Sequence, residues 1–210
     1  MTTEADRAAT KHAYNAAAQV YAKKYDAIAP RVAEIELVWS FVTKPDPYVL
    51  EIGFGSGREA RYLLTKTSHY IGIDISETMR SLAQAQVATG TFVCADVTTY
   101  QFTSPLDVVF AFASLLHSDQ ADLRAIFSNI ASAMEPGGLV FLSLKRHDTY
   151  GCGVVDDGES VRTFYYYTKQ VVLDCADGQF ELVHYDEQHL KEPWFTILLR
   201  RIDPFVTITG

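Results

Sequence analysis

The sequence predicts a doubly wound α/β fold: a mostly parallel seven-stranded sheet with an antiparallel last strand, and helices on both faces. Two patterns predict this fold. From residue 48 onward, short apolar runs alternate with stretches of helical periodicity, as in parallel βαβ units. The first apolar run leads into a glycine-rich turn at residues 53–57, where a backbone can approach a ligand closely.

The elements follow one another without an internal repeat. Residues 11–42 are predicted to form one or two helices, with Pro30 interrupting them or opening the second. Strands are predicted at residues 48–52, 70–73, 91–95, 106–111, 139–144, 180–185 and 194–200. Helices are predicted at residues 57–64, 76–87, 119–134 and 169–174, with Asp119 capping the third of them. We expect the last two strands to form an antiparallel pair that closes the sheet.

Composition and charge restrict the class of protein. The chain has 210 residues, 48% of them hydrophobic and 21% charged, which suits one globular domain with a substantial core. The formal net charge of -8 opposes binding to nucleic-acid backbones and to anionic membranes. No apolar run is long enough to span a bilayer, and residues 1–10 lack the features of a signal peptide.

The cysteines and histidines predict neither a disulfide framework nor a metal site. Cys94, Cys152 and Cys175 are odd in number and widely spaced, which fits a reducing cytoplasm. No two histidines are spaced to bind a metal from one helix face. We therefore expect a cytoplasmic protein without a metal, a nucleic-acid partner or a membrane partner. The sequence leaves the oligomeric state open.

The glycine turn separates two classes of nucleotide-binding protein. A dinucleotide fingerprint, G-x-G-x-x-G, would place its third glycine at position 58, which is Arg58. Here the glycines are Gly53, Gly55 and Gly57, so the spacing is G-x-G-x-G. This spacing disfavours a nicotinamide-dependent oxidoreductase.

Two acids follow the next two predicted strands. Asp74 ends the second strand, 21 residues after Gly53, where a carboxylate can accept both hydroxyls of a ribose. Asp96 follows the third strand. Either acid alone would more often be a helix N-cap or a solvated loop residue. Because both lie at carboxyl ends of strands, where open α/β sheets bind ligands, their order after the glycine turn favours a nucleoside site.

These features resemble the first motif of class I S-adenosylmethionine-dependent methyltransferases, in which an acid, here Glu51, stands two residues before G-x-G-x-G. Other segments resemble small bacterial members from an uncharacterised branch. Residues 106–117 resemble their fourth-strand motif, and residues 134–140 their L-x-P-G-G turn, with Met134 in place of leucine. The helix that caps the cofactor is similar to residues 14–26, and residues 143–145 and 162–168 also match. The resemblance covers nearly the whole chain.

The resemblance implies S-adenosylmethionine as cofactor and direct transfer of its methyl group to a small-molecule acceptor. It implies that Asp96 lies against the adenine amino group, and that Tyr14 or Tyr21 contacts the methionine end, although an aromatic stripe on a helix is more often core. The cofactor-binding residues predicted in this way are Tyr14, Tyr21, Glu51, Gly53, Gly55, Gly57, Asp74, Ile75, Met79, Asp96, Val97 and Phe112.

The chain then divides into three parts. We expect an N-terminal helical cap at residues 1–43, a cofactor-binding core at 44–145, and an acceptor-side loop with closing strands at 146–210. Two residues depart from the family pattern and can alter the acceptor pocket: Arg58, where many relatives carry a small or hydroxyl residue, and Phe112, where polar residues are common.

His117 is the candidate catalytic residue. It follows the fourth strand at the edge where the cofactor is expected, and an imidazole titrates near neutrality, which suits a general base. The alternative, equally weighted, is that His117 packs at the entrance of the next helix.

The acceptor side is predicted around residues 146–167, a long connection that leaves the fifth strand at the ligand-binding edge. Asp157-Gly158 predicts a small hairpin within it, and residues 186–193 are expected beside the same pocket. The candidate substrate-binding residues are Ser114, Lys145, Arg162, Tyr165 and Trp194. With Lys145 and Arg162 as cations, the acceptor is hypothesised to be anionic. The alternative is a solvated Lys145, with Arg162 in a surface bridge to a nearby acid such as Asp157.

Two other functions remain open at this point. One is an S-adenosylmethionine-binding protein without transferase activity, such as a sensor or an inactive partner subunit. The other, disfavoured by Arg58, is a dinucleotide-dependent oxidoreductase.

Overall fold

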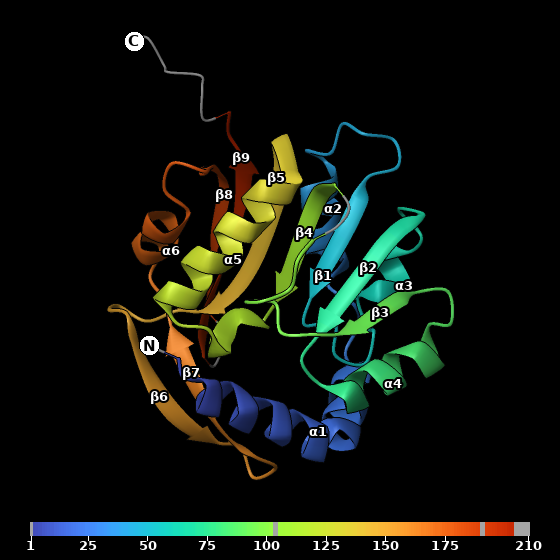
Figure 1. Cartoon of the computed structure of the whole chain (residues 1–210), viewed down its shortest axis with the longest axis vertical. Coiled ribbons are helices and arrows are strands. Elements are labelled where there is room, and N and C mark those ends of the chain that lie inside the picture. The colour runs from blue at the N-terminus through green and yellow to red at the C-terminus, as the bar shows by residue number, and fades with distance from the viewer. Residues whose placement is uncertain (1, 103–104, 190–191, 204–210) are drawn as a thin grey trace.

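A seven-stranded sheet forms the centre of the computed structural model, which describes residues 2–102, 105–189 and 192–203 (Figure 1). The strand order is β3-β2-β1-β4-β5-β9-β8. The strands are β1 (Tyr48–Ile52), β2 (His69–Asp74), β3 (Thr91–Cys94), β4 (Leu106–Phe112), β5 (Met134–Lys145), β8 (Phe180–His189) and β9 (Pro193–Arg201). Neighbours among β1 to β5 pair in parallel, whereas β9 is antiparallel to both β5 and β8. The predicted fold class is therefore confirmed.

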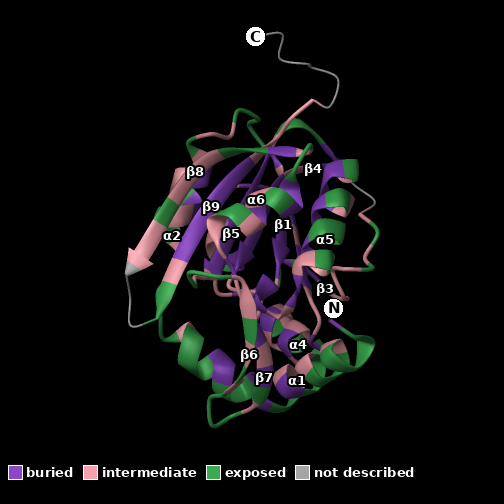
Figure 2. Ribbon diagram, turned by 90° about the vertical axis from the view of Figure 1, so that its left-hand side faces the viewer, coloured by how far each residue is buried: buried purple, intermediate pink, exposed green. Residues whose placement is uncertain are grey.

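Helices lie on both faces of this sheet and across the edge where the parallel strands end (Figure 1). They are α1 (Glu4–Asp26), α2 (Val32–Trp39), α3 (Ala60–Leu63), α4 (Glu77–Gln86), α5 (Gln120–Ala133) and α6 (Lys169–Ala176), with a short 3₁₀ helix, η1 (Leu115–His117). Alternation along each strand divides the core in two, since successive side chains point to opposite faces. Leu50 packs in the cluster under α5 and α6, while its neighbour Val49 packs in the cluster with α2, α3 and α4. Figure 2 shows the buried residues concentrated in the central strands.

A second, two-stranded sheet stands apart from the first. Strands β6 (Gly151–Asp156) and β7 (Val161–Tyr166) pair antiparallel around the predicted turn, with Gly158 at a φ of 85°. We call them the hairpin. The hairpin lies beside α1, and the two together cover the edge where β1, β2 and β4 end (Figure 1).

The structure moves several predicted boundaries. Helix α1 begins at Glu4 rather than near residue 11, because Thr3 and Asp6 form a capping box. Helix α3 has four residues, since the chain is still turning at residues 55–59. Met134 already begins β5, and the ladder shifts register before Leu139, so the predicted turn at 136–138 lies inside an irregular strand.

The region predicted to form a loop at 186–193 is mostly strand. β8 continues to His189 and β9 begins at Pro193, while residues 190 and 191 lie outside the described part of the chain. None of the helices that the structure describes is long and apolar enough to cross a membrane.

Candidate active site

The glycine turn takes a backbone conformation that side chains disfavour. Gly53, Gly55 and Gly57 have φ angles of 76°, 56° and 88°, in the left-handed region. A Cβ on Gly53 would lie 2.2 Å from Cβ of Ser114, so the ends of β1 and β4 meet only because position 53 has no side chain. A Cβ on Gly55 would have no atom within 4 Å, so this glycine faces open space.

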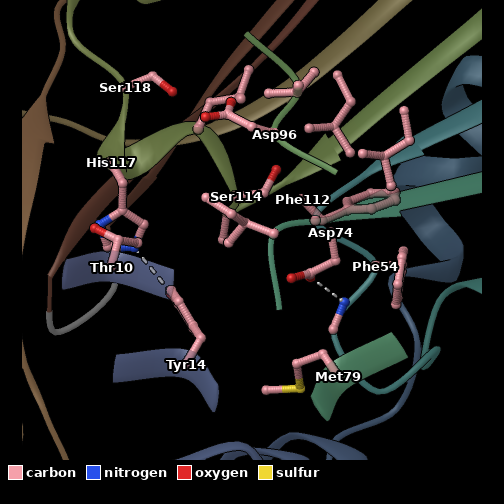
Figure 3. A pocket seen from close by; sticks show the side chains of 18 of the residues that line it. Thr10, Tyr14, Phe54, Asp74, Met79, Asp96, Phe112, Ser114, His117 and Ser118 are labelled. Atoms are coloured by element: carbon pink, nitrogen blue, oxygen red, sulfur yellow. Dashed lines mark hydrogen bonds between the residues drawn. The ribbon is translucent and has the colours of Figure 1, made fainter. Parts of the chain in front are cut away.

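That space is a cavity of about 250 Å³ between the sheet edge, α1 and η1 (Figure 3). Ten of the twelve predicted cofactor-binding residues line it: Tyr14, Tyr21, Gly53, Gly55, Asp74, Ile75, Met79, Asp96, Val97 and Phe112. His117 and Ser114 line it as well, and the buried Ser114 Oγ has no hydrogen-bond partner in the described chain. A largely apolar cavity with a few convergent polar groups is the usual form of a small-molecule site.

Asp74 is fixed at the end of β2 by backbone donors. The N–H of Gly55 donates to Oδ2 at 3.0 Å (Figure 3). The N–H of Ser76 donates to Oδ1 at 2.9 Å. Each oxygen keeps a further lone pair for a ligand hydroxyl. Burial raises the pKa of Asp74 to about 6, although the backbone donors act in the opposite direction.

Asp96 lines the cavity, and both of its carboxylate oxygens already have partners. Its Oδ1 accepts the N–H and the hydroxyl of Thr98, at 2.9 and 2.7 Å. Its Oδ2 lies 3.4 Å from Nε of Arg7, which also contacts Asp122 at 3.3 Å. Arg7 from α1 therefore closes this end of the cavity over the carboxylate.

Glu51 and Gly57 differ from the other predicted residues, because neither lines the cavity. Alternation along β1 turns Glu51 toward the face that carries α3, where it is 1% exposed and accepts the hydroxyl of Tyr70 at 2.6 Å. Burial raises the pKa of Glu51 to about 8, and the nearby Glu59 carboxylate adds to that rise. Glu51 thus lies under the turn and does not reach the ligand side.

His117 is held through both ring nitrogens. Its Nδ1 lies 2.7 Å from the carbonyl oxygen of Thr163, which can only accept, so Nδ1 carries the proton. Nε2 then accepts the hydroxyl of Tyr14 at 3.0 Å (Figure 3). Burial lowers the pKa of His117 to about 4, and the charges of Arg162 and Lys145 add to this effect. The imidazole is therefore neutral at physiological pH.

The other predicted substrate-binding residues do not line this cavity: Lys145, Arg162, Tyr165 and Trp194. Lys145 lies 2.6 Å from Glu192 and over the rings of Phe164 and Trp194. Lys145 lines a separate cavity of about 540 Å³ together with His147 and Tyr166.

The other two residues of this group belong to the hairpin. Arg162 is paired with Asp157, the partner named in the alternative interpretation; Arg162 itself is buried, whereas Asp157 lies in the exposed turn of the hairpin. Tyr165 stacks on Tyr150 and accepts the hydroxyl of Thr2 at 3.3 Å.

Several lining residues were missed at the sequence level. Arg7 and Thr10 line the cavity from α1, and Glu59 lines it from the glycine turn, where it pairs at 2.5 Å with Arg58, a lining residue that the sequence had related only to the acceptor pocket. A signal for the first two was present: positions 7, 10 and 14 share one helix face with Tyr21. In the described part of the chain, no three His, Cys, Asp or Glu side chains gather as metal ligands would.

Comparison with known proteins agrees with this geometry. Residues 49–138 match a family model described as a methyltransferase domain. A trans-aconitate 2-methyltransferase from Acidovorax sp. (strain JS42) is 30% identical over 106 residues, which cover 49% of this chain and 40% of that protein. A phosphoethanolamine N-methyltransferase 2 from Caenorhabditis elegans is 29% identical over 128 residues, covering 58% and 28%. The chain thus spans well under half the length of these two relatives.

A solved structure extends the match to the whole fold. The magnesium protoporphyrin IX methyltransferase of Synechocystis PCC 6803, with bound S-adenosylhomocysteine, superposes with a TM-score of 0.73 at 16% identity, covering 93% of this chain and 99% of that one. At this identity the likeness concerns the fold alone. Together with the domain match over residues 49–138, it shows that the chain is similar in fold to a methyltransferase that binds S-adenosylhomocysteine.

Proposed function

We propose that this chain is an enzyme that transfers a methyl group from S-adenosylmethionine to a small-molecule acceptor. The observation that carries the proposal is the Asp74 carboxylate, which two backbone N–H groups fix beside a glycine turn that faces an open cavity. This arrangement fits a nucleoside, since its hydroxyls need a fixed acceptor and close backbone approach. Asp96 is proposed to accept from the adenine, and Ile75, Met79, Val97 and Phe112 to enclose the rest.

In methyl transfer from S-adenosylmethionine, the main task of the protein is to position the donor and the acceptor. S-adenosylmethionine, when bound, supplies an electrophilic methyl group on a sulfonium. The cavity walls would orient the acceptor in line with that methyl and exclude water. Tyr14 and Tyr21, which line the cavity from α1, are proposed to cover the methionine end.

His117 is proposed as the base where the acceptor must lose a proton. Its neutral state and its unprotonated Nε2 suit this role, and an acceptor hydroxyl or amine would take the place of the Tyr14 hydroxyl. Ser114, with its unpartnered Oγ, is proposed to contact the acceptor.

A finer hypothesis is that the acceptor is anionic and meets Lys145, Arg162, Tyr165 and Trp194. Because Glu192 and Asp157 already neutralise the two cations, an anion would have to displace a carboxylate. A paired experiment tests this: for an anionic acceptor, Lys145→Ala raises KM and Glu192→Gln lowers it. Equal KM values in both variants would show that the acceptor does not meet Lys145.

Calorimetry tests the proposal as a whole. Wild type should bind S-adenosylhomocysteine and not a nicotinamide dinucleotide, and Asp74→Asn should bind it more weakly. A panel of small acceptors, assayed by S-adenosylhomocysteine release, then identifies the reaction. Binding without turnover on any acceptor would favour the binding protein without transferase activity.

The three-part division at residues 43 and 145 and the cytoplasmic location stay predictions. Limited proteolysis would test the first and cell fractionation the second.

A further inference from the structure

Arg162 lies inside the protein, between the hairpin and α1, although an arginine is always charged. It is 7% exposed. Its guanidinium carbon lies 4.9 Å from the ring centre of Tyr14, 4.8 Å from that of Tyr21 and 5.2 Å from that of Phe164. One terminal nitrogen lies 2.5 Å from Asp157, while the buried Nε has no hydrogen-bond partner within the described residues. Burying a cation with an unmet donor is unfavourable, so packing alone is a poor reason for an arginine here.

The same carboxylate fixes the second ring of this stack. The hydroxyl of Tyr21 donates to Asp157 at 3.0 to 3.1 Å and lies 2.7 Å from Oγ of Ser160. Arg162 and Tyr21 therefore share one anchor at the tip of the hairpin. A flat guanidinium can stack on rings and bind a carboxylate at once, which a lysine ammonium cannot.

Two consecutive residues of β7, Arg162 and Thr163, contact Tyr14 and His117, the two side chains that share a hydrogen bond. The Thr163 carbonyl accepts the Nδ1 proton of His117, and Arg162 stacks on the Tyr14 ring whose hydroxyl binds Nε2. Tyr14 and His117 come from different elements, α1 and η1, that β7 contacts in turn. Strand β7 is thus the part of the chain that can set the distance between them.

We infer that Arg162 is a positioning residue for the proposed methyl transfer: by stacking on Tyr14, it holds the Tyr14 hydroxyl on Nε2 of His117 until the acceptor takes its place. The inference rests on the proposed function only in giving His117 a part in the reaction. The charge of Arg162 also helps to keep Nε2 unprotonated. The groups that face His117 are Tyr14 from α1 and two cations, Arg162 from β7 and Lys145 from β5. Both cations oppose a proton on the imidazole, and Nε2 stays an acceptor.

The competing explanation is that Arg162 only ties the hairpin to α1 through Asp157. Both explanations predict a loss of stability on substitution, so thermal melting does not distinguish them. The hydrogen bond on Nε2 and the pKa of His117 do distinguish them, because a purely structural tie leaves both unchanged.

The test uses long-range ¹H–¹⁵N NMR spectra of the full chain, with the His117 signals identified by their loss in His117→Gln. Tyr14→Phe gives the Nε2 shift of an imidazole without this hydrogen bond. We expect Arg162→Met to reproduce that shift and to raise the pKa of His117 toward its usual range. Arg162→Lys keeps the charge, so it should show the shift with a smaller rise in pKa. Arg146→Met, which removes a cation paired with Glu187 at the same edge, is the matched control and should keep both wild-type values.

A wild-type Nε2 shift and pKa in folded Arg162→Met would overturn the inference. If that variant does not fold, the Nε2 shift in Arg162→Lys decides by the same standard. Calorimetry with S-adenosylhomocysteine is run on the same samples. Failure of the wild type to bind would sink the proposed function, while the His117 signals would still decide the role of Arg162.

Discussion

Burial of the Asp74 carboxylate makes ligand binding at this residue dependent on pH. Its pKa of about 6 lies above that of an ordinary carboxyl, so the carboxylate is present at neutral pH and is lost as the pH falls through 6. We expect the affinity for S-adenosylhomocysteine to fall over the same range. Asp74→Asn should weaken binding about 10- to 150-fold at pH 7.5, as for lost hydrogen bonds to a charged group, and should remove the pH dependence near 6. Calorimetry at pH 5 and 7.5 measures both effects. An equal pH dependence in wild type and variant would assign it to another group.

Gly55 offers a test of steric exclusion with a matched control. Gly55→Val places a branched side chain in the cavity and should abolish binding of S-adenosylhomocysteine. Gly178 has a similar φ of 70° and equally open surroundings but lies away from the cavity, so Gly178→Val carries the same backbone strain and should bind normally. Both should lose similar stability, about 1 to 2 kcal/mol for a left-handed non-glycine residue. Normal binding by a folded Gly55→Val would show that the turn does not approach the ligand.

The role of His117 can be separated from its packing. His117→Ala should reduce turnover per folded molecule while the affinity for S-adenosylhomocysteine stays unchanged. Because the pKa of His117 is about 4, the imidazole stays neutral and should add no ionisation to the pH–rate profile between pH 5.5 and about 8. Initial rates on the identified acceptor, corrected for the folded fraction from circular dichroism, provide the measurement. Lost stability with normal turnover of the folded enzyme would instead support a packing role at the helix entrance.

The cavity residues fall into those that local sequence predicts and those that it does not. Asp74 and Asp96 were predictable because each ends or follows a strand, and strand ends are visible in a single chain. Glu51 does not line the cavity, because the motif gives its position but not the face of β1 on which it lies. Arg7 reaches the cavity only because α1 crosses the sheet edge, a tertiary fact without a local signal beyond its helix face.

At the level of elements, strands were easier to predict than helix ends. β1 to β4 were found within one or two residues, because buried parallel strands are short apolar runs between turn residues. The first two turns of α1 were missed although Thr3 and Asp6 have the spacing of a capping box. The hairpin was predicted from Asp157-Gly158, but its contact with α1 depends on the buried Arg162, which no periodicity marks.

Helix α5 provides a stability test at this scale. Asp119 caps it, with Oδ1 accepting the N–H groups of Ala121 and Asp122 at 2.8 and 2.9 Å, and its other oxygen accepts the N–H of Thr2. Asp119→Ala should lower the free energy of unfolding by about 1 to 2 kcal/mol in urea titrations, whereas Asp119→Asn, which can still cap, should lose less. Equal losses in the two variants would mean that the carboxylate charge, rather than the cap, supplies the stability.

At the scale of the whole molecule, the site lies between parts that are distant in sequence. The sheet edge supplies its floor, α1 from the start of the chain covers it, and the hairpin from residues 151–166 supports that cover. Helix α1 is tied down along its length. Arg7 pairs with Asp96, Asn15 accepts the hydroxyl of Ser76 at 2.7 Å, and Asp26 accepts that of Ser56 at 2.6 Å. A ligand that fills the cavity would therefore lie against α1, and we expect its release to depend on movement of this helix.

This enclosure predicts a change in kinetics without new contacts to the ligand. Asn15→Ala removes two hydrogen bonds between α1 and the start of α4, from the Ser76 hydroxyl and the Thr78 N–H, so it should speed dissociation of S-adenosylhomocysteine several-fold, measured by stopped-flow displacement. Lys23→Ala, an exposed change on the same helix, is the control and should leave the rate unchanged. A wild-type rate in Asn15→Ala would mean that release does not require this part of α1 to open.

The partner of His117 on the hairpin has a consequence for how the protein can evolve. The group that fixes the imidazole proton is the main-chain carbonyl of residue 163, and every amino acid supplies one. Codon changes at position 163 are therefore invisible to selection at this hydrogen bond, so long as the strand persists. Changes at Tyr14 and Arg162 are not. Among homologues of this protein we accordingly expect many different amino acids at position 163 and few at position 162, although the two positions are adjacent on one strand.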